Sequence, residues 1–170
     1  MSSLAELLAP LHARAPDGAD TDFLARLYAS TRPDLHSLTA DPAFVSSLIA
    51  MQQRLQTAAY LHAYPTANYL VLEYQGQCAG RIVVNESAAD LRLVDIAVLP
   101  ALRGQGVGSQ ILGALQRYCR ERGLSLTLSV HHTNPDARRL YRRLGFEIES
   151  CSALSDQLVW NNAVRVMAHS

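Results

Sequence analysis

A glycine-rich segment, Arg103-Gly104-Gln105-Gly106-Val107-Gly108-Ser109, constrains the fold of this chain more than any other feature. An apolar run from Leu91 to Leu99 precedes it and apolar residues at helical spacing follow it, so the glycines are predicted to form a strand-to-helix turn. Three glycines in five positions let the backbone approach a ligand closely, because no Cβ stands in the way. The unpaired N–H groups and dipole of the helix start favour a phosphate there, and Arg103 can add a charge with forked donors.

Three kinds of phosphate-binding loop have sequence patterns that this segment either meets or fails to meet. A P-loop requires a lysine, and the chain contains none. The dinucleotide spacing Gly-x-Gly-x-x-Gly is not met by Gly104-x-Gly106-x-Gly108, which also lies late in a short chain. The pattern Arg/Gln-x-x-Gly-x-Gly/Ala is met, and it resembles the pyrophosphate loop of the GNAT superfamily of N-acetyltransferases, which bind acetyl-CoA. For the loop alone, a glycine-rich turn without a ligand is the alternative.

A second motif follows about 30 residues later and adds to this resemblance. Asn134, Arg138 and Tyr141 are four and then three positions apart, so they share one face of a predicted helix. The resemblance is to the second cofactor motif of the same superfamily, N-x-x-A-x-x-x-Y-x-x-x-G-F, and is carried by Asn134-Pro135, Ala137, Tyr141 and Gly145-Phe146. The alternative for Tyr141 is a packed aromatic at a helix end. For the arginines of this helix the alternative is a solvated face, expected for at least two of them.

Composition limits the class of protein. At 170 residues with 49% apolar content, the chain is expected to form one globular domain, residues 1–170. Fifteen basic and fifteen acidic residues give no net charge, so neither nucleic acid nor a membrane is expected as a partner. The three cysteines form no CxxC pair, which fits a reducing cytoplasm. No signal peptide, membrane span or metal site is expected.

The fold class predicted is α/β (α+β), with a mixed, mostly antiparallel sheet of about six to seven strands and about four helices, as the resemblance implies. The first nine residues are expected to be helical or loose, and the segment 151–162 to be polar and irregular. One long helix is expected to bury a stripe formed by Phe44, Val45, Leu48, Ile49, Leu55 and Ala59. Helices are predicted over 21–31, 42–62, 107–122 and 135–144. Strands are predicted over 11–15, 69–74, 78–85, 91–98, 124–130, 146–148 and 163–167.

The resemblance implies how the donor would bind. In the GNAT fold the strand before the glycine loop splays from its neighbour, and the pantetheine arm pairs with strand backbone in that gap. Here this would use Ile96, Ala97 and Val98. The pyrophosphate would lie on the amides of Arg103, Gly104, Gln105, Gly106, Val107, Gly108 and Ser109. Asn134 and Arg138 would lie near the arm or the adenine-side phosphate, and Tyr141 near the thioester sulfur.

The activity implied is acetyl transfer from acetyl-CoA to a primary amine by direct attack. The backbone N–H of Val98 is expected to polarise the carbonyl, and Tyr141 to act as general acid. Some members of the superfamily carry a glutamate base where this chain has Ser129. Asp95 and His131 are therefore the leading candidate bases, with His132, Glu73 and Glu86 as further options. The acceptor is expected to be a small-molecule or protein amine. The region Gln157–Asn162 is a candidate pocket wall or homodimer interface. The alternative function is a non-catalytic acyl-CoA-binding or interaction module.

Overall fold

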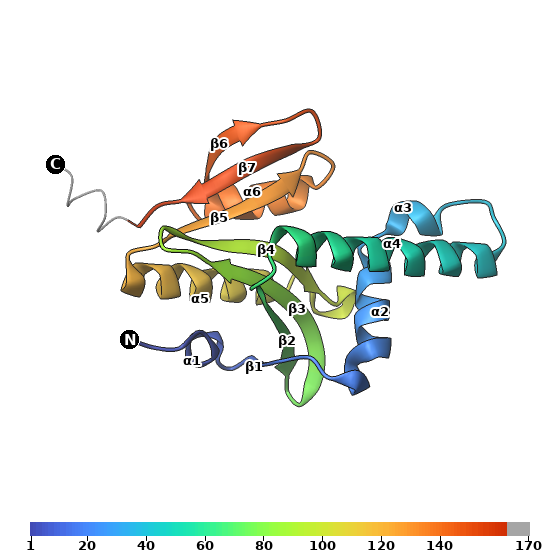
Figure 1. Cartoon of the computed structure of the whole chain (residues 1–170), viewed down its shortest axis with the longest axis horizontal. Helices are drawn as coiled ribbons and strands as arrows, with labels where there is room; N and C mark the ends of the chain where they lie inside the picture. Colours follow the sequence, from blue (N-terminus) through green and yellow to red (C-terminus); the bar gives the residue numbers. More distant parts are fainter. Residues whose placement is uncertain (163–170) are drawn as a thin grey trace.

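The computed structural model describes residues 1–162, which form one seven-stranded sheet with helices on both faces (Figure 1). The strand order is β1-β2-β3-β4-β5-β7-β6, and every neighbouring pair is antiparallel except β4 and β5. This arrangement confirms the predicted fold class. The strands are β1 His12–Arg14, β2 Asn68–Tyr74, β3 Gln77–Glu86, β4 Asp90–Val98, β5 Ser125–His131, β6 Glu147–Cys151 and β7 Ser155–Trp160. The α-helices are α1 Leu4–Leu8, α2 Thr21–Ser30, α3 Pro33–His36, α4 Pro42–Ala63, α5 Val107–Arg122 and α6 Pro135–Arg143.

Local capping signals set the ends of the main helices. Asp41 caps α4 by accepting from the Ala43 N–H at 3.2 Å, and Pro42 occupies the first turn, where a missing N–H costs nothing. Gly123, at φ 69°, ends α5 in the left-handed conformation that favours glycine. Asn134 caps α6 through its side-chain oxygen, which accepts from the Ala137 N–H at 3.2 Å. These boundaries agree with the predicted ones to within two residues.

The main core lies between one face of the sheet and α5. Ile111, Leu112 and Leu115 of α5 are fully buried, and they cluster with Ile82 of β3 and Leu126 of β5. The opposite face is covered near β2 and β3 by α2, whose Phe23 and Leu27 pack with Val71 in a second cluster. The sheet therefore separates an α5/α6 side from an α2/α4 side, and the candidate site opens between these two sides.

Two predictions for the fold were wrong. The segment 151–162 is not irregular, because β7 occupies Ser155–Trp160 and is inserted between β5 and β6. The stripe expected on α4 is also not buried as one surface. Val45 and Ile49 are buried against the body, whereas Phe44 and Leu55 keep 59% and 58% of their surface exposed.

The early segment is helical over Leu4–Leu8, and a short helix, α3, was not anticipated. The strand predicted over 163–167 lies outside the described residues. No helix within residues 1–162 combines the length and apolar character needed to cross a membrane.

Candidate active site

The candidate site begins where two parallel strands separate. The ladder between β4 and β5 joins Asp90 to Ser125 and ends at the pair Leu93 and Leu128. Beyond that pair, β4 continues to Val98 along β3, and β5 continues to His131 along β7. Val94 is an extra residue on β4, because Val83 pairs with Asp95 while Val84 pairs with Leu93. Such bulges bend a strand and increase its twist, which explains why β4 turns away from β5 at this point.

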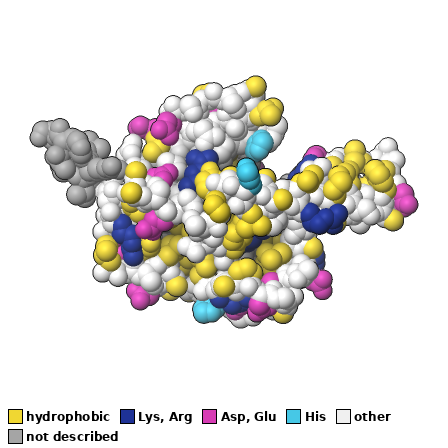
Figure 2. All heavy atoms as spheres, viewed as in Figure 1, with side chains coloured by type: hydrophobic (Ala, Val, Ile, Leu, Met, Phe, Trp, Pro, Cys, Tyr) yellow, Lys and Arg dark blue, Asp and Glu magenta, His cyan; other side chains and the backbone are white. Residues whose placement is uncertain are grey.

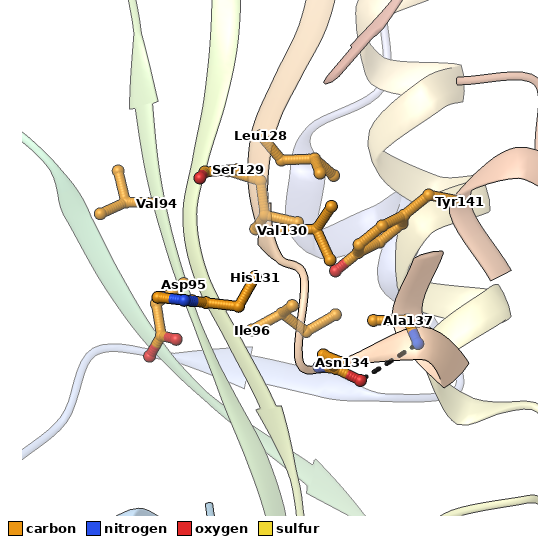
Figure 3. Close-up of a pocket in the computed structure, with 11 residues that line it drawn as sticks. Val94, Asp95, Ile96, Leu128, Ser129, Val130, His131, Asn134, Ala137 and Tyr141 are labelled. Carbon is orange, nitrogen blue, oxygen red and sulfur yellow. Dashed lines mark hydrogen bonds between the residues drawn. The ribbon is translucent and has the colours of Figure 1, made fainter. Parts of the chain in front are cut away.

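A cavity of about 150 Å³ occupies the space between the separated strands (Figure 3). Its walls are residues 93–96 of β4, residues 128–131 of β5 and three residues at or on α6: Asn134, Ala137 and Tyr141. Strand alternation places Val130 on the buried α5/α6 side and its neighbours Ser129 and His131 on the other side. The cavity therefore connects the two sides of the sheet.

Tyr141 contributes a phenol to this cavity. Its ring is 7% exposed and packs against Phe146 with ring centroids 5.6 Å apart. Figure 3 shows its hydroxyl directed from α6 toward the gap between the strands. Burial, followed by the negative charge of Asp95, raises the Tyr141 pKa to about 12. The hydroxyl is therefore protonated at neutral pH and is available as a hydrogen-bond donor.

The glycine loop ends at the start of α5. Gly104 and Gly106 have φ values of 77° and 80°, and Gly106 is the N-cap residue, without a side-chain cap. A Cβ built at either position meets no atom within 4 Å, so backbone conformation and not packing favours glycine here. The amides that follow Gly106 begin a 16-residue helix with no acidic residue in its first turn. This end of α5 is electrostatically suited to an anion.

Two arginines predicted to bind the cofactor already have protein partners. Arg103 donates from Nε to the Val98 carbonyl at 3.1 Å and from its terminal nitrogen to Ser30 Oγ at 3.3 Å, which ties the loop to β4 and α2. Arg138 donates to Asp156 Oδ2 at 3.1 Å. Of the three predicted pantetheine residues, Ile96 lines the cavity, whereas Ala97 and Val98 lie further along β4.

The two candidate bases lie in different environments. Asp95 forms an ion pair with Arg81, and this guanidinium also contacts Gln56 Oε1 of α4 at 3.4 Å. His131 is exposed at the end of β5, and its ring has no hydrogen-bond partner among residues 1–162. Both residues line the cavity with Tyr141, so the structure brings the three predicted catalytic side chains to one place.

Arg81 near the site was not singled out by sequence reasoning, although it is a charge inside the apolar run of β3. Gln157 and Trp160 belong to the region that was expected to form a pocket wall or a homodimer interface. Gln157 lies on β7, where it accepts from Arg92 at 2.7 Å and donates to Ser129 Oγ at 3.0 Å. The Ser129 hydroxyl is thus held by a neighbouring amide, and Gln157 is a sheet residue next to the site. Trp160 does not line the cavity, and the guanidinium carbon of Arg120 lies over its ring, 5.5 Å from the ring centroid.

A buried carboxylate supports the α6 side of the site. Asp156 is 2% exposed and accepts from His132 Nε2 at 2.8 Å as well as from Arg138. The hydrogen bond from His132 is the main reason that its pKa lies below the usual range, with further contributions from Cys151 and Arg138. Asp156 therefore ties β7 to α6 and to the segment that carries Asn134. The sequence signal that could have predicted the burial of Asp156 was strand alternation, which places Asp156 and Leu158 on the same inward face of β7.

Within residues 1–162, no group of three or more His, Cys, Asp or Glu side chains is arranged to hold a metal ion.

The sheet opens between two parallel strands, with a helix N-terminus and a buried phenol beside the opening, which is the arrangement that the resemblance of the two motifs to the GNAT superfamily implies. The sequence model of the acetyltransferase (GNAT) family matches residues 32–146. The chain belongs to this family.

Relatives with named activities are similar over part of their length. A Bacillus subtilis (strain 168) protein, named for ribosomal protein bS18-alanine N-acetyltransferase activity, is 32% identical over 84 residues, which are 49% of this chain and 56% of that protein. Streptothricin acetyltransferase of Streptomyces lavendulae is 37% identical over 46% of this chain and 43% of its own length. The matches thus span about half of these two proteins. Aminoalkylphosphonate N-acetyltransferase of Salmonella typhimurium is 28% identical over 66% of this chain and 82% of its length.

Solved structures share the fold at low identity. PaiA N-acetyltransferase from Thermoplasma acidophilum, solved in complex with coenzyme A, superposes with a TM-score of 0.65 at 15% identity and covers 89% of this chain and 98% of its own. The ribosomal-protein-S18-alanine N-acetyltransferase from Escherichia coli gives a TM-score of 0.58 at 18% identity, over 89% and 93% of the two chains.

Proposed function

We propose that this protein transfers an acetyl group from acetyl-CoA to a primary amine by direct attack of the amine on the thioester. The observation that carries the proposal is the opening between β4 and β5 after Leu93 and Leu128, which joins the two sides of the sheet beside Tyr141. Membership of the acetyltransferase family supports the reaction class. The coenzyme A complex of a protein with the same fold supports the donor.

The donor is proposed to lie along the opened edge of β4. Its pantetheine arm would use the backbone of Ile96, Ala97 and Val98, and its pyrophosphate the amides from Arg103 to Ser109. The bare N-terminus of α5 supports this orientation, because it offers unpaired N–H groups and a favourable dipole. Since Arg103 and Arg138 already donate to protein groups, the backbone amides are proposed as the main phosphate contacts.

The acceptor is proposed to enter from the α4 side. Asp95 is held there by Arg81, which in turn contacts α4, so a carboxylate lies on the side of the gap opposite α6. An amine with a pKa near 10 arrives mostly as an ammonium ion, and an anion at this place attracts it. The named relatives acetylate quite different amines, so the proposal specifies a primary amine and no single acceptor.

Two side chains, His131 and Tyr141, divide the proton transfers. The amine nitrogen attacks the carbonyl carbon, the C–S bond breaks, and the Val98 N–H is proposed to stabilise the oxyanion. His131 is proposed to remove the proton from the amine, because protonating Asp95 would break its ion pair with Arg81. Tyr141 donates a hydrogen bond or proton to the departing thiolate, and its raised pKa keeps that proton in place until then.

The test is thiol release with a panel of amines, comparing wild type, His131→Gln and Asp95→Asn. His131→Gln is expected to lower kcat by about 10²-fold. Asp95→Asn is expected to act mainly by raising KM for the amine. His12→Gln, at an exposed position on β1, is the control and should behave as wild type. A blank wild type with intact CoA binding would instead favour the non-catalytic acyl-CoA-binding module.

A further inference from the structure

The long helix α4 presents a second apolar surface that the rest of the described chain does not cover. Phe44, Leu48, Met51 and Leu55 follow each other at spacings of four, three and four residues. At about 100° per residue they lie within a sector of roughly 60°, separate from the buried side of the helix at Val45 and Ile49. We call these four residues the α4 stripe.

The α4 stripe is exposed although its chemistry is that of a buried surface. Phe44, Met51 and Leu55 keep 59%, 41% and 58% of their surface in solvent. Figure 1 shows α4 reaching beyond the sheet together with α3, and Figure 2 shows hydrophobic side chains spread over this projecting arm. A contiguous exposed apolar stripe on a helix is typical of an interaction site.

The low charge of α4 limits the kind of partner that its stripe can bind. Between Pro42 and Ala63, Arg54 is the only Asp, Glu, Lys or Arg residue. The helix therefore offers neither an acidic nor a basic array that would select an oppositely charged protein or a membrane surface. The uncharged stripe is best covered by another uncharged apolar helix face, and a second copy of α4 is such a face. In a two-fold arrangement the same surface serves both partners.

The available area fits a weak dimer. A large apolar side chain can present ~200 Å² of surface, and Phe44, Met51 and Leu55 each expose roughly half of that. Together they offer about 300 Å² of apolar surface per copy. Leu48 and the adjacent Ala58 and Ala59 extend this to about 400–500 Å². Two copies would then bury about 800–1,000 Å², at the lower edge of specific interfaces, where association is weak and reversible.

We propose that the α4 stripe is a self-association surface through which two copies of this chain form a reversible homodimer. The proposal does not depend on acetyl transfer, because the stripe lies outside the cavity that contains Tyr141. It predicts a dissociation constant in the micromolar range.

Sedimentation velocity from about 1 to 300 µM protein tests the proposal. Wild type is expected to shift from monomer to dimer with concentration, and Leu55→Glu or Leu55→Lys alone to remain monomeric because a charge replaces an apolar contact. Both substitutions place good helix formers at an exposed position, so folding is expected to be retained, with circular dichroism as the check. Leu154→Glu, at a residue 72% exposed between β6 and β7, is the matched control and should dimerise as wild type does.

Wild type that stays monomeric at 300 µM would overturn the proposal. So would a Leu55→Glu variant that dimerises as strongly as wild type, since the interface would then lie elsewhere.

Discussion

Replacing Tyr141 with phenylalanine removes one oxygen atom from the candidate site and changes little else. The ring contact with Phe146, at 5.6 Å between centroids, is retained. The Tyr141 hydroxyl has no hydrogen-bond partner among residues 1–162, so no protein group loses a bond when it is removed. We therefore expect the free energy of unfolding to change by no more than about 1 kcal/mol.

The effect on catalysis should be much larger. A positioned general acid contributes about 10²–10⁴-fold, which corresponds to about 2.7–5.5 kcal/mol of transition-state stabilisation. We expect Tyr141→Phe to lower kcat by at least 10²-fold while the dissociation constant of CoA stays within about threefold. Because burial raises the Tyr141 pKa to about 12, the phenol stays protonated, and the ratio of wild-type to variant kcat should be constant from pH 6 to 10.

The assay is thiol release under saturating acetyl-CoA, with CoA binding measured by calorimetry on the same samples. Tyr118→Phe is the matched control, because Tyr118 lies on α5 and its hydroxyl bonds to Glu86, outside the cavity. Full activity of Tyr141→Phe would refute the acid assignment. Equal loss in Tyr118→Phe would show that the effect reflects stability and not chemistry.

Two further substitutions test residues that shape the site, Asp156 beside α6 and Gly106 at the start of α5. Asp156→Asn should lower the melting temperature and weaken CoA binding, because Arg138 and His132 lose their shared partner. Since its pKa is lowered, the Asp156 carboxylate stabilises the fold above its ordinary pKa near 4, and this stabilisation is lost as pH falls. Urea unfolding should therefore show a difference in stability between wild type and variant at pH 7 that narrows as the pH falls below about 4, and a difference that does not narrow would contradict this. Gly106→Glu should abolish CoA binding by charge and bulk, whereas Gly106→Asn, which tolerates φ 80°, should largely keep it. Calorimetry decides this, and tight binding by Gly106→Glu would reject the phosphate site.

Prediction from the sequence was most successful for elements whose structure is set by residues close together in the chain. The caps at Asp41 and Asn134, the left-handed glycines at 106 and 123, and the apolar run of β4 are local signals, and their elements were found with correct type. The glycine loop and the Asn134–Phe146 motif also located the cavity, because they follow the two strands that separate.

Failures occurred where partners distant in sequence decide the outcome. β7 was missed because Ser155, Asp156 and Gln157 are polar, and its place in the sheet depends on pairing with β5 and β6. Asp156 is buried only because Arg138 and His132 meet it there. The pattern on α4 was apolar on two sides, and periodicity alone could not show which side the body would cover. Arg81 became relevant only when the register of β3 placed it beside Asp95.

The proposed mechanism depends on acetyl-CoA binding along the opening between β4 and β5 and at the start of α5. A thermal-shift series with acetyl-CoA, CoA, NADH and ATP at equal concentrations measures this binding. A ligand that binds only the native state adds about 2.7 kcal/mol at 100 times its Kd, which is about 5–10 °C for a domain of this size. We expect such a rise for acetyl-CoA and CoA alone. No rise with either, or a larger one with NADH or ATP, would contradict it.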